Sequence, residues 1–203
     1  TQYSSEYMDV TVHRDGMEYS LHFEKGKNVG GLKKEPKKYA STGTRTRFRP
    51  DIDVFTDTAI PPEYFEDILR KQAVTNAGVE FLFRRELPDG KFEEKTFCYP
   101  RGPVDYLTEF LEDKAFTDVV DLQTERQGRD RADKPEYKLK IQVTFAFSVT
   151  RQKLEYYHNS SFLEHGGAPE KAVQSAFTSA INAYLKQQNK YNKNESAIKF
   201  VDV

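Results

Sequence analysis

Apolar and polar residues alternate along this chain of 203 residues with two different periods. The clearest alternation lies in residues 138–147, KLKIQVTFAF, where every second side chain is apolar, as in a strand with one buried face. We predict a strand there, with residues 154–157 returning beside it after a turn at 149–153. In residues 169–186 the apolar residues recur every three or four positions instead, so that they share one face of a predicted helix. A hairpin with a helix packed on it is the expected centre of the fold.

The start of this helix has strong local signals. Gly166 and Gly167 free the backbone, Pro169 suits the first turn because its missing N–H needs no partner there, and Glu170 complements the helix dipole. The free N–H groups at such a start could also bind an anion. We rank that interpretation below a structural role for the loop.

The first fifty residues predict three strands. Met8–His13 and Met17–Phe23 alternate on either side of Arg14-Asp15-Gly16, which has the composition of a hairpin turn. A third strand begins at Gly43 and stops near Pro50. The lysine-rich segment 26–38 contains a glycine pair, so we predict a mobile, solvated connection there rather than a phosphate-binding patch.

The middle of the chain predicts two helices around a hairpin. Pro61-Pro62 opens a helix that ends at Asn76-Ala77-Gly78, and Gly102-Pro103 opens another. Between them, residues 79–85 and 91–99 pair across Pro88-Asp89-Gly90.

Residues 117–122 are a candidate strand, and the charged stretch 123–136 is predicted to be an exposed loop. The order of elements indicates an α+β fold with mixed sheets, and the composition changes after Tyr99-Pro100, the best candidate for a domain boundary. The chain opens without a Met and ends on a strand-like segment, 197–203, so we expect it to be a fragment.

Composition limits the functional classes. Lys and Arg number 31 against 32 Asp and Glu, a net charge of -1, which argues against nucleic-acid binding by bulk charge but leaves a local patch open. No apolar run reaches the roughly 20 residues needed to span a bilayer, so we expect no membrane association and a soluble, cytoplasmic protein. The single cysteine, Cys98, is expected to be a packed strand thiol, and it excludes an internal disulfide framework.

One polar loop gathers residue types that occur in catalytic and zinc sites: His158, Ser160, Ser161, Glu164 and His165. A catalytic triad needs its members in separate positions, and the spacing matches no common zinc site. Loop hydrogen bonding is the preferred interpretation, and no metal site is predicted.

Several motifs together resemble the ATPase subunits of bacterial type IIA DNA topoisomerases, that is, DNA gyrase B and its topoisomerase IV counterpart. The most specific is residues 42–51, TGTRTRFRPD. Residues 5–16, 23–26, 76–79 and 99–107 and the glycine pair at 166–167 also match in order, so the resemblance covers nearly the whole chain.

The resemblance implies a domain organisation. Residues 1–101 would be the C-terminal half of a GHKL (Bergerat) ATPase domain, and residues 102–203 a transducer domain like the second domain of ribosomal protein S5, truncated at its C-terminus. The family's metal-binding Asn, catalytic Glu and glycine-rich lid would precede Thr1, and its phosphate-contacting lysine, on a Q-T-K sequence, would follow Val203. No catalytic residue is therefore expected in this chain.

Three positions carry over from the family's nucleotide pocket: Arg14, Gly43 and Thr44. A strand hydroxyl can hold a water or the adenine amine, and a guanidinium can lie flat over a planar ring, which in the family includes coumarin-type inhibitors. Without the resemblance, Arg14 would be an ordinary turn residue and Thr44 an ordinary strand residue.

The resemblance implies a parent enzyme that couples ATP binding and hydrolysis, with Mg²⁺, to DNA strand passage. Its partners would be DNA, the DNA-cleaving subunit and a second copy of the ATPase region. Residues 166–173, GGAPEKAV, and Phe48-Arg49-Pro50 depart from the usual family sequences, which leaves gyrase and topoisomerase IV both open. The alternatives are a free-standing nucleic-acid-binding module with the S5-like fold and another GHKL ATPase.

Overall fold

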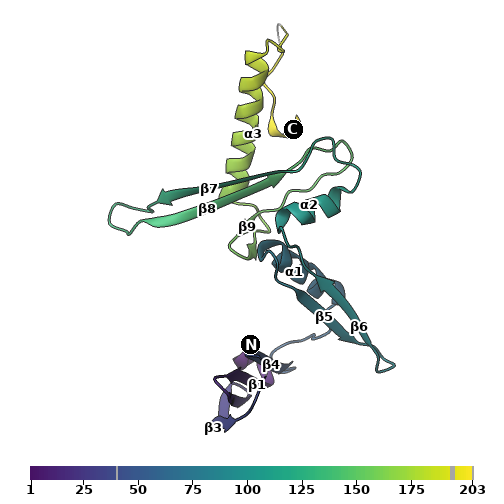
Figure 1. The fold of residues 1–203 in the computed structure, drawn as a ribbon, viewed down its shortest axis with the longest axis vertical. Helices are drawn as coiled ribbons and strands as arrows, with labels where there is room; N and C mark the ends of the chain where they lie inside the picture. The colour runs from purple at the N-terminus through teal and green to yellow at the C-terminus, as the bar shows by residue number, and fades with distance from the viewer. Residues whose placement is uncertain (40, 193–194, 203) are drawn as a thin grey trace. The chain divides into compact units, whose positions relative to one another are not determined.

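The computed structural model describes residues 1–39, 41–192 and 195–202 (Figure 1). The chain divides into two compact units, Thr1–Pro61 (unit 1) and Pro62–Val203 (unit 2). Helices and antiparallel strands occur in separate segments, so the predicted α+β class is confirmed. No helix in the described ranges is both long and apolar enough to cross a bilayer.

Unit 1 is a four-stranded antiparallel sheet in the order β3-β2-β1-β4. A short 3₁₀ turn, Gln2–Ser4, leads into it, and the strands are β1 Ser5–Arg14, β2 Met17–Glu24, β3 Lys27–Pro36 and β4 Gly43–Pro50. The predicted turn between β1 and β2 is confirmed: Asp15 and Gly16 have φ of 53° and 71°, the left-handed values that a two-residue hairpin turn requires.

The prediction of a mobile connection at 26–38 is wrong, because β3 occupies most of it. Lys25 and Gly26, with φ of 44° and 82°, form a second tight turn that brings β3 back beside β2. Gly30 and Gly31 also have positive φ, and they lie where the β2–β3 register shifts between Ser20 and His22. The glycine pair therefore forms an irregularity within a strand and does not end it.

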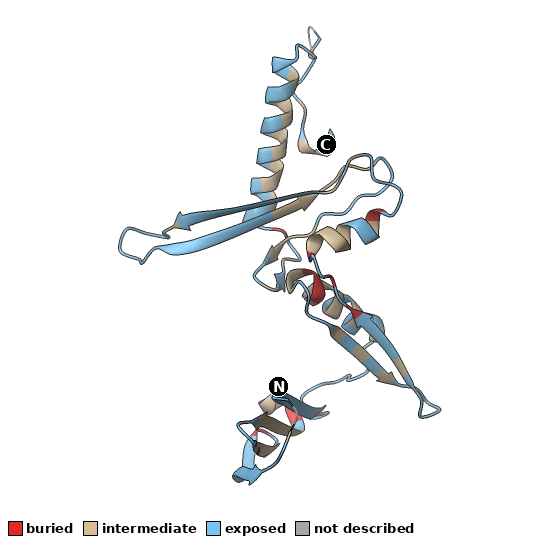
Figure 2. Cartoon of the chain, in the orientation of Figure 1, coloured by how far each residue is buried: buried red, intermediate tan, exposed pale blue. Residues whose placement is uncertain are grey.

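Unit 2 begins with helix α1, Pro62–Thr75, followed by the hairpin β5 Phe81–Glu86 and β6 Phe92–Phe97 and by helix α2, Pro103–Leu111. These elements match the predicted helix, hairpin and helix, but Cys98, expected to be a packed strand thiol, follows the end of β6 and is exposed. Their buried core consists of Ala73, Val74, Phe97 and Tyr99, with Leu69, Phe81, Phe83 and Tyr106 packed around it. Figure 2 shows this concentration of buried residues beside α1.

The predicted partner of residues 138–147 is wrong. β8, Tyr137–Phe145, pairs with β7, Val120–Gly128, and not with residues 154–157. Of the charged stretch 123–136, predicted to be a loop, residues 123–128 belong to β7 in a long two-stranded ribbon, and residues 129–136 connect its strands (Figure 1). Charged residues are tolerated there because most of the ribbon is exposed to solvent. Only Tyr157 of the expected return strand lies in a strand. It belongs to β9, Tyr157–His158, which pairs with the equally short β10, Ser161–Phe162.

Helix α3, Ala168–Gln187, confirms the predicted helix after the double glycine. Phe177 packs edge-on against Phe145 and Phe147, with ring centroids 4.9 and 6.4 Å away, so α3 contacts the apolar side of β8 as expected. No α3 residue is fully buried. The strand expected at 197–203 is not found among the described residues, where Phe200–Asp202 is a 3₁₀ turn; Val203 lies outside them.

A network of hydrogen bonds joins α2 to the segment that precedes β9. The Tyr106 hydroxyl donates to Glu155 Oε1 at 3.1 Å, the Tyr157 hydroxyl donates to Glu155 Oε2 at 2.7 Å, and Lys153 Nζ donates to the Tyr106 oxygen at 2.5 Å. Burial raises the pKa of Tyr157, and its hydrogen bond to Glu155 raises it further. The network satisfies polar groups around the core of unit 2 and therefore has a structural role.

Candidate functional site

The three candidate nucleotide-contacting residues lie at one end of the β1–β4 pair. Arg14 ends β1, and Gly43 and Thr44 begin β4. In the ladder Val12 is opposite Thr44 and His13 is opposite Gly43. Antiparallel pairing therefore places Arg14 close to two residues about thirty positions further along the chain.

The pleat of the sheet assigns these residues to faces, because cross-strand partners share a face and successive residues alternate. Thr44 shares a face with Val12 and, through the β1–β2 pairing, with Tyr19. Arg14 is two residues beyond Val12 and falls on the same face. We call this the apolar face; its other residues include Met8, Val10, Leu21, Phe23 and Phe48.

Each of the three residues is accessible to a ligand. The Arg14 side chain is 73% exposed and forms only a surface ion pair with Asp15, at 3.2 Å. Thr44 is exposed, and its hydroxyl makes no hydrogen bond within the described part of the chain. Nothing lies within 4 Å of the position that a Cβ on Gly43 would occupy, on the face that Gly43 shares with His13.

The edge therefore has the chemistry to hold one side of a planar, hydrogen-bonding ring. The Thr44 hydroxyl can donate and accept, the Arg14 guanidinium can stack, and Val12 and Tyr19 supply apolar surface between them. No group of three His, Cys, Asp or Glu side chains that could hold a metal ion occurs among the residues described.

The opposite, polar face of unit 1 has a compact cluster around Glu18. Lys37 Nζ donates to Glu18 Oε2 at 3.0 Å, the Tyr39 hydroxyl donates to the same oxygen, and His13 Nε2 lies 3.1 Å from it. The His13 and Tyr39 rings are stacked with centroids 3.5 Å apart. The hydrogen bonds from Tyr39 and Lys37 lower the pKa of Glu18 to about 2. The cluster fixes the segment after β3 across the polar face.

A second pair lies on the polar face, further along the ladder. His22 Nδ1 is 2.7 Å from Asp9 Oδ1, and His22 Nε2 is 3.3 Å from Glu24 Oε1. The bond to Asp9, followed by that to Glu24, raises the pKa of His22. Asp9 and Glu24 are thus both engaged with His22.

The loop with two histidines and two serines makes strand and hydrogen-bond contacts. His158 and Ser161 are cross-strand partners in the short β9–β10 pair, and the Ser160 hydroxyl donates to Asn76 Oδ1 at 3.4 Å. The structural interpretation preferred from the sequence agrees with these contacts.

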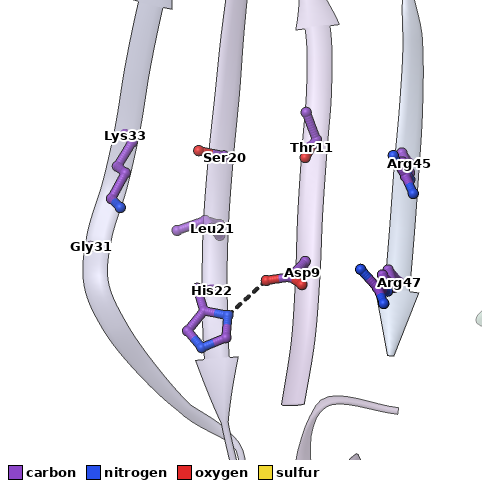
Figure 3. Close-up of a pocket in the computed structure, with 9 residues that line it drawn as sticks. All are labelled: Asp9, Thr11, Ser20, Leu21, His22, Gly31, Lys33, Arg45 and Arg47. Carbon is purple, nitrogen blue, oxygen red and sulfur yellow. Dashed lines mark hydrogen bonds and ion pairs between the residues drawn. The ribbon is translucent and has the colours of Figure 1, made fainter. Parts of the chain in front are cut away.

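Sequence reasoning missed a row of cations on the polar face. Arg45 is opposite Thr11 and Arg47 is opposite Asp9, while Lys33 lies on the far strand opposite Ser20. These side chains, drawn in Figure 3, help to line an open hollow of about 430 Å³. The signal was present as Arg45-Thr46-Arg47-Phe48-Arg49, because a period of two on a strand places all three arginines on one face.

A family model and the curated relatives both indicate similarity to the B subunits of DNA gyrase and topoisomerase 4. The family model described as DNA gyrase B matches residues 102–203. The DNA gyrase B protein of Thermotoga maritima is 29% identical over 196 residues, covering 95% of this chain and 30% of that protein. The DNA topoisomerase 4 B protein of Bacillus subtilis is 29% identical over 188 residues, covering 90% of this chain and 26% of that protein. The chain thus spans less than a third of the length of these relatives.

Two solved structures have the same fold. The 43K ATPase domain of Thermus thermophilus gyrase B, in complex with an aminocoumarin, superposes with a TM-score of 0.69 at 22% sequence identity. The match covers 96% of this chain and 50% of the Thermus thermophilus chain. The B subunit of DNA gyrase from Myxococcus xanthus gives a TM-score of 0.72 at 19% sequence identity, and the match covers 90% of this chain and 51% of that chain. The α+β fold is therefore shared with the 43K ATPase domain of gyrase B.

Proposed function

The chain belongs to the DNA gyrase B family, and we propose that it forms part of the ATP-binding and transducer region of a type II DNA topoisomerase. In this proposal residues 1–101 are the C-terminal half of the GHKL ATPase domain and residues 102–203 most of the transducer. The match of the family model to residues 102–203 supports the second part. The two compact units meet at Pro61 and Pro62 instead, so the division after residue 101 stays a prediction.

The observation that carries the proposal is the placement of Arg14 and Thr44 on one face and at one end of the β1–β4 pair. We propose that Thr44 holds the adenine end of ATP through its hydroxyl and that Arg14 lies at the mouth of the pocket. Gly43 precedes Thr44 at the start of β4, beside the end of β1 where Arg14 lies. An aminocoumarin, the ligand named for the Thermus thermophilus domain, would use the same edge.

In the complete enzyme, binding and hydrolysis of ATP with Mg²⁺ supply the free energy that drives strand passage. This chain contributes one wall of the pocket and the element that transmits the change of state. DNA, the DNA-cleaving subunit and a second copy of the ATPase region are the proposed partners, and the cytoplasm is the proposed compartment. We expect the isolated chain to have no Mg²⁺-dependent ATPase activity, and a measurable rate that depends on Mg²⁺ would contradict this.

The test is an NMR titration of the ¹⁵N-labelled chain with ADP and, separately, with an aminocoumarin. We expect the largest amide shifts at Arg14, Gly43 and Thr44. Thr44→Val and Arg14→Gln should each weaken binding about tenfold, the effect of losing roughly one hydrogen bond or stacking contact.

Matched controls come from the β5–β6 hairpin in unit 2. Thr96→Val and Arg84→Gln make the same chemical changes at exposed positions away from the sheet of unit 1. Binding without shifts at the three amides, or equal losses in the control variants, would refute the assignment of this edge.

A further inference from the structure

Tyr39 lies shortly after β3 and contacts both strands of the β1–β2 hairpin. Its ring lies over the His13 ring, with centroids 3.5 Å apart and an angle of 11° between the planes, and its hydroxyl donates to Glu18 Oε2. Lys37 Nζ lies 5.4 Å from the centroid of the Tyr39 ring and donates to the same Glu18 oxygen at 3.0 Å. We call this set of contacts the Tyr39 clamp.

The Tyr39 clamp is partly shielded from solvent. The His13 and Glu18 side chains are 29% and 21% exposed, and Tyr39 is half-buried. The hydrogen bonds from Tyr39 and Lys37 lower the pKa of Glu18 to about 2, so its carboxylate is ionised at neutral pH and accepts charge-assisted hydrogen bonds. Such contacts hold a segment more firmly than an exposed ion pair does.

The clamp lies behind the candidate nucleotide-contacting residues, on the other face of the sheet. In the β1–β4 ladder His13 is opposite Gly43, and Val12 is opposite Thr44. His13 is also the residue directly before Arg14. The clamp therefore holds the point of the backbone at which the two strands that carry Arg14 and Thr44 meet. We call this end of the β1–β4 pair the nucleotide edge.

A second contact joins the segment after β3 to the turn beyond Arg14. The backbone N–H of Lys37 donates to the Gly16 carbonyl oxygen at 2.9 Å. β4 is the last strand of the sheet, with β1 as its neighbour, and strand ends open locally at little cost in free energy. Segment 37–39, bound to both β1 and the β1–β2 turn, opposes such opening at the nucleotide edge.

We propose that Tyr39 is a positioning residue for the nucleotide edge: it holds Arg14 and Thr44 in the arrangement that receives the ligand, without touching the ligand itself. The proposal rests on the proposed function of this edge. Binding to an edge that is already ordered costs less conformational entropy, so the clamp raises affinity without adding a ligand contact. When the edge is ordered in only a fraction of molecules, the apparent affinity falls by that fraction.

The test compares ADP binding to the full chain and to its Tyr39 variants in the same ¹⁵N NMR titration. Tyr39→Ala removes both the stacked ring and the hydrogen bond, and it should weaken ADP binding about tenfold by lowering the ordered fraction. Tyr39→Phe keeps the stacked ring and leaves Lys37 and His13 in contact with Glu18. Its loss of affinity should therefore be only about threefold.

Combination with Thr44→Val separates positioning from general destabilisation. If Tyr39 acts by placing Thr44, adding Tyr39→Ala to Thr44→Val should weaken ADP binding by much less than a further factor of about ten, because the contact that Tyr39 places is already lost. Single losses that multiply to about 100-fold in the double variant would overturn the positioning role.

The matched control is Tyr7→Ala, which removes a tyrosine from the same face near the other end of β1. Tyr7 is opposite Arg49, and its ring centroid lies 5.9 Å from the Arg47 guanidinium carbon. This variant should bind ADP within about twofold of the wild type, because it leaves the nucleotide edge unchanged. Circular dichroism and urea titration should show that every variant is folded.

Amide hydrogen exchange without nucleotide gives a second readout. Alternate amides of an edge strand are bonded to its neighbour, and those within residues 43–46 should exchange about tenfold faster in Tyr39→Ala. Those within residues 47–49, further from the clamp, should exchange as in the wild type.

The outcomes distinguish this proposal from the proposed function. Unchanged ADP affinity in Tyr39→Ala, or an equal loss in Tyr7→Ala, would overturn the role of Tyr39 and leave the proposed function intact. If ADP does not shift the amides of Arg14, Gly43 and Thr44 in the wild type, the proposed function fails instead. Hydrogen exchange then decides alone whether Tyr39 orders this edge: faster exchange within residues 43–46 supports the clamp, and unchanged exchange refutes it.

Discussion

Gln72 Nε2 donates a 2.8 Å hydrogen bond to the backbone carbonyl oxygen of Ser160, 88 residues further along the chain. The same turn is held by the hydrogen bond from Ser160 to Asn76, and Lys71 Nζ lies 3.9 Å from the centroid of the Phe162 ring. Helix α1 is thus fixed directly to the β9–β10 turn. If residues 1–101 and 102–203 are separate domains in the parent enzyme, this contact is a physical link between them.

We predict that Gln72→Ala lowers the free energy of unfolding of unit 2 by about 1 kcal/mol, because it removes this hydrogen bond and leaves the Ser160 carbonyl with one partner fewer. Urea denaturation followed by circular dichroism measures the change. Gln152→Ala removes an exposed glutamine in the same unit and should change stability by less than about 0.5 kcal/mol. Equal effects of the two variants would show that the contact contributes nothing.

Glu18 should make the stability of unit 1 depend on pH in a defined window. Its pKa is lowered from 4.5 to about 2, first by the Tyr39 hydrogen bond and then by that of Lys37. A lowered carboxyl pKa stabilises the folded state above the unfolded-state value, and this contribution is lost as the pH falls through the folded-state value. The stability difference between wild type and Glu18→Gln should therefore be constant above pH 4.5 and shrink between pH 4.5 and about 2.

Two measurements check this prediction. Carboxyl ¹³C NMR should give a titration midpoint near 2 for Glu18 in the folded chain. Urea denaturation at a series of pH values should show the difference from Glu18→Gln disappearing at the acid end. Glu35→Gln makes the same chemical change on the neighbouring strand, opposite Glu18, and is the matched control. A Glu18 midpoint near 4.5 would contradict the cluster.

Gly102 occupies a position that strongly favours glycine. It has φ of 55° and ψ of -124° at the start of α2, and a Cβ there would lie 2.9 Å from the Val74 carbonyl oxygen. Gly102→Ala should therefore lower the free energy of unfolding by about 2 to 4 kcal/mol, through backbone strain and displacement of α1.

Gly90 supplies a matched comparison for this change. Its φ is 77°, but nothing lies within 4 Å of the added Cβ, so Gly90→Ala should cost only the backbone term of about 1 kcal/mol. Thermal and urea unfolding of the two variants separate the contribution of strain from that of steric contact. Equal losses would show that the Val74 carbonyl moves aside freely.

The sequence predicted correctly the turns and helix starts that depend only on a few adjacent residues. Asp15-Gly16 and Asp89-Gly90 mark the turns of two hairpins, and Pro62, Pro103 and Pro169 mark the first turns of three helices. The motif at 42–51 indicated the family and contains two of the three candidate nucleotide-contacting residues, Gly43 and Thr44. A tight turn or a helix start depends on the backbone preferences of adjacent residues, and these preferences can be inferred from the residue types alone.

Strand pairing was decided by tertiary structure. Residues 138–147 had the right alternation, but their partner was β7 and not the segment that follows them. β3 was mistaken for a loop because Gly30, Gly31 and the lysines around them are poor strand formers, although pairing with β2 still holds them extended. A strand is stabilised by hydrogen bonds to a partner that its own composition does not specify.

The sequence alone determined the turns, the helix starts, the α+β class and the spacing of the arginines along β4. Only the tertiary structure decided that Thr44 and Arg14 share a face, that residues 62–101 pack with the segment after them, and that Asp9 and Glu18 are engaged away from Arg45 and Arg47. The reason is that short-range preferences act between chain neighbours. Pairing, packing and the balance of charge on a surface depend on residues that meet only after the chain has folded.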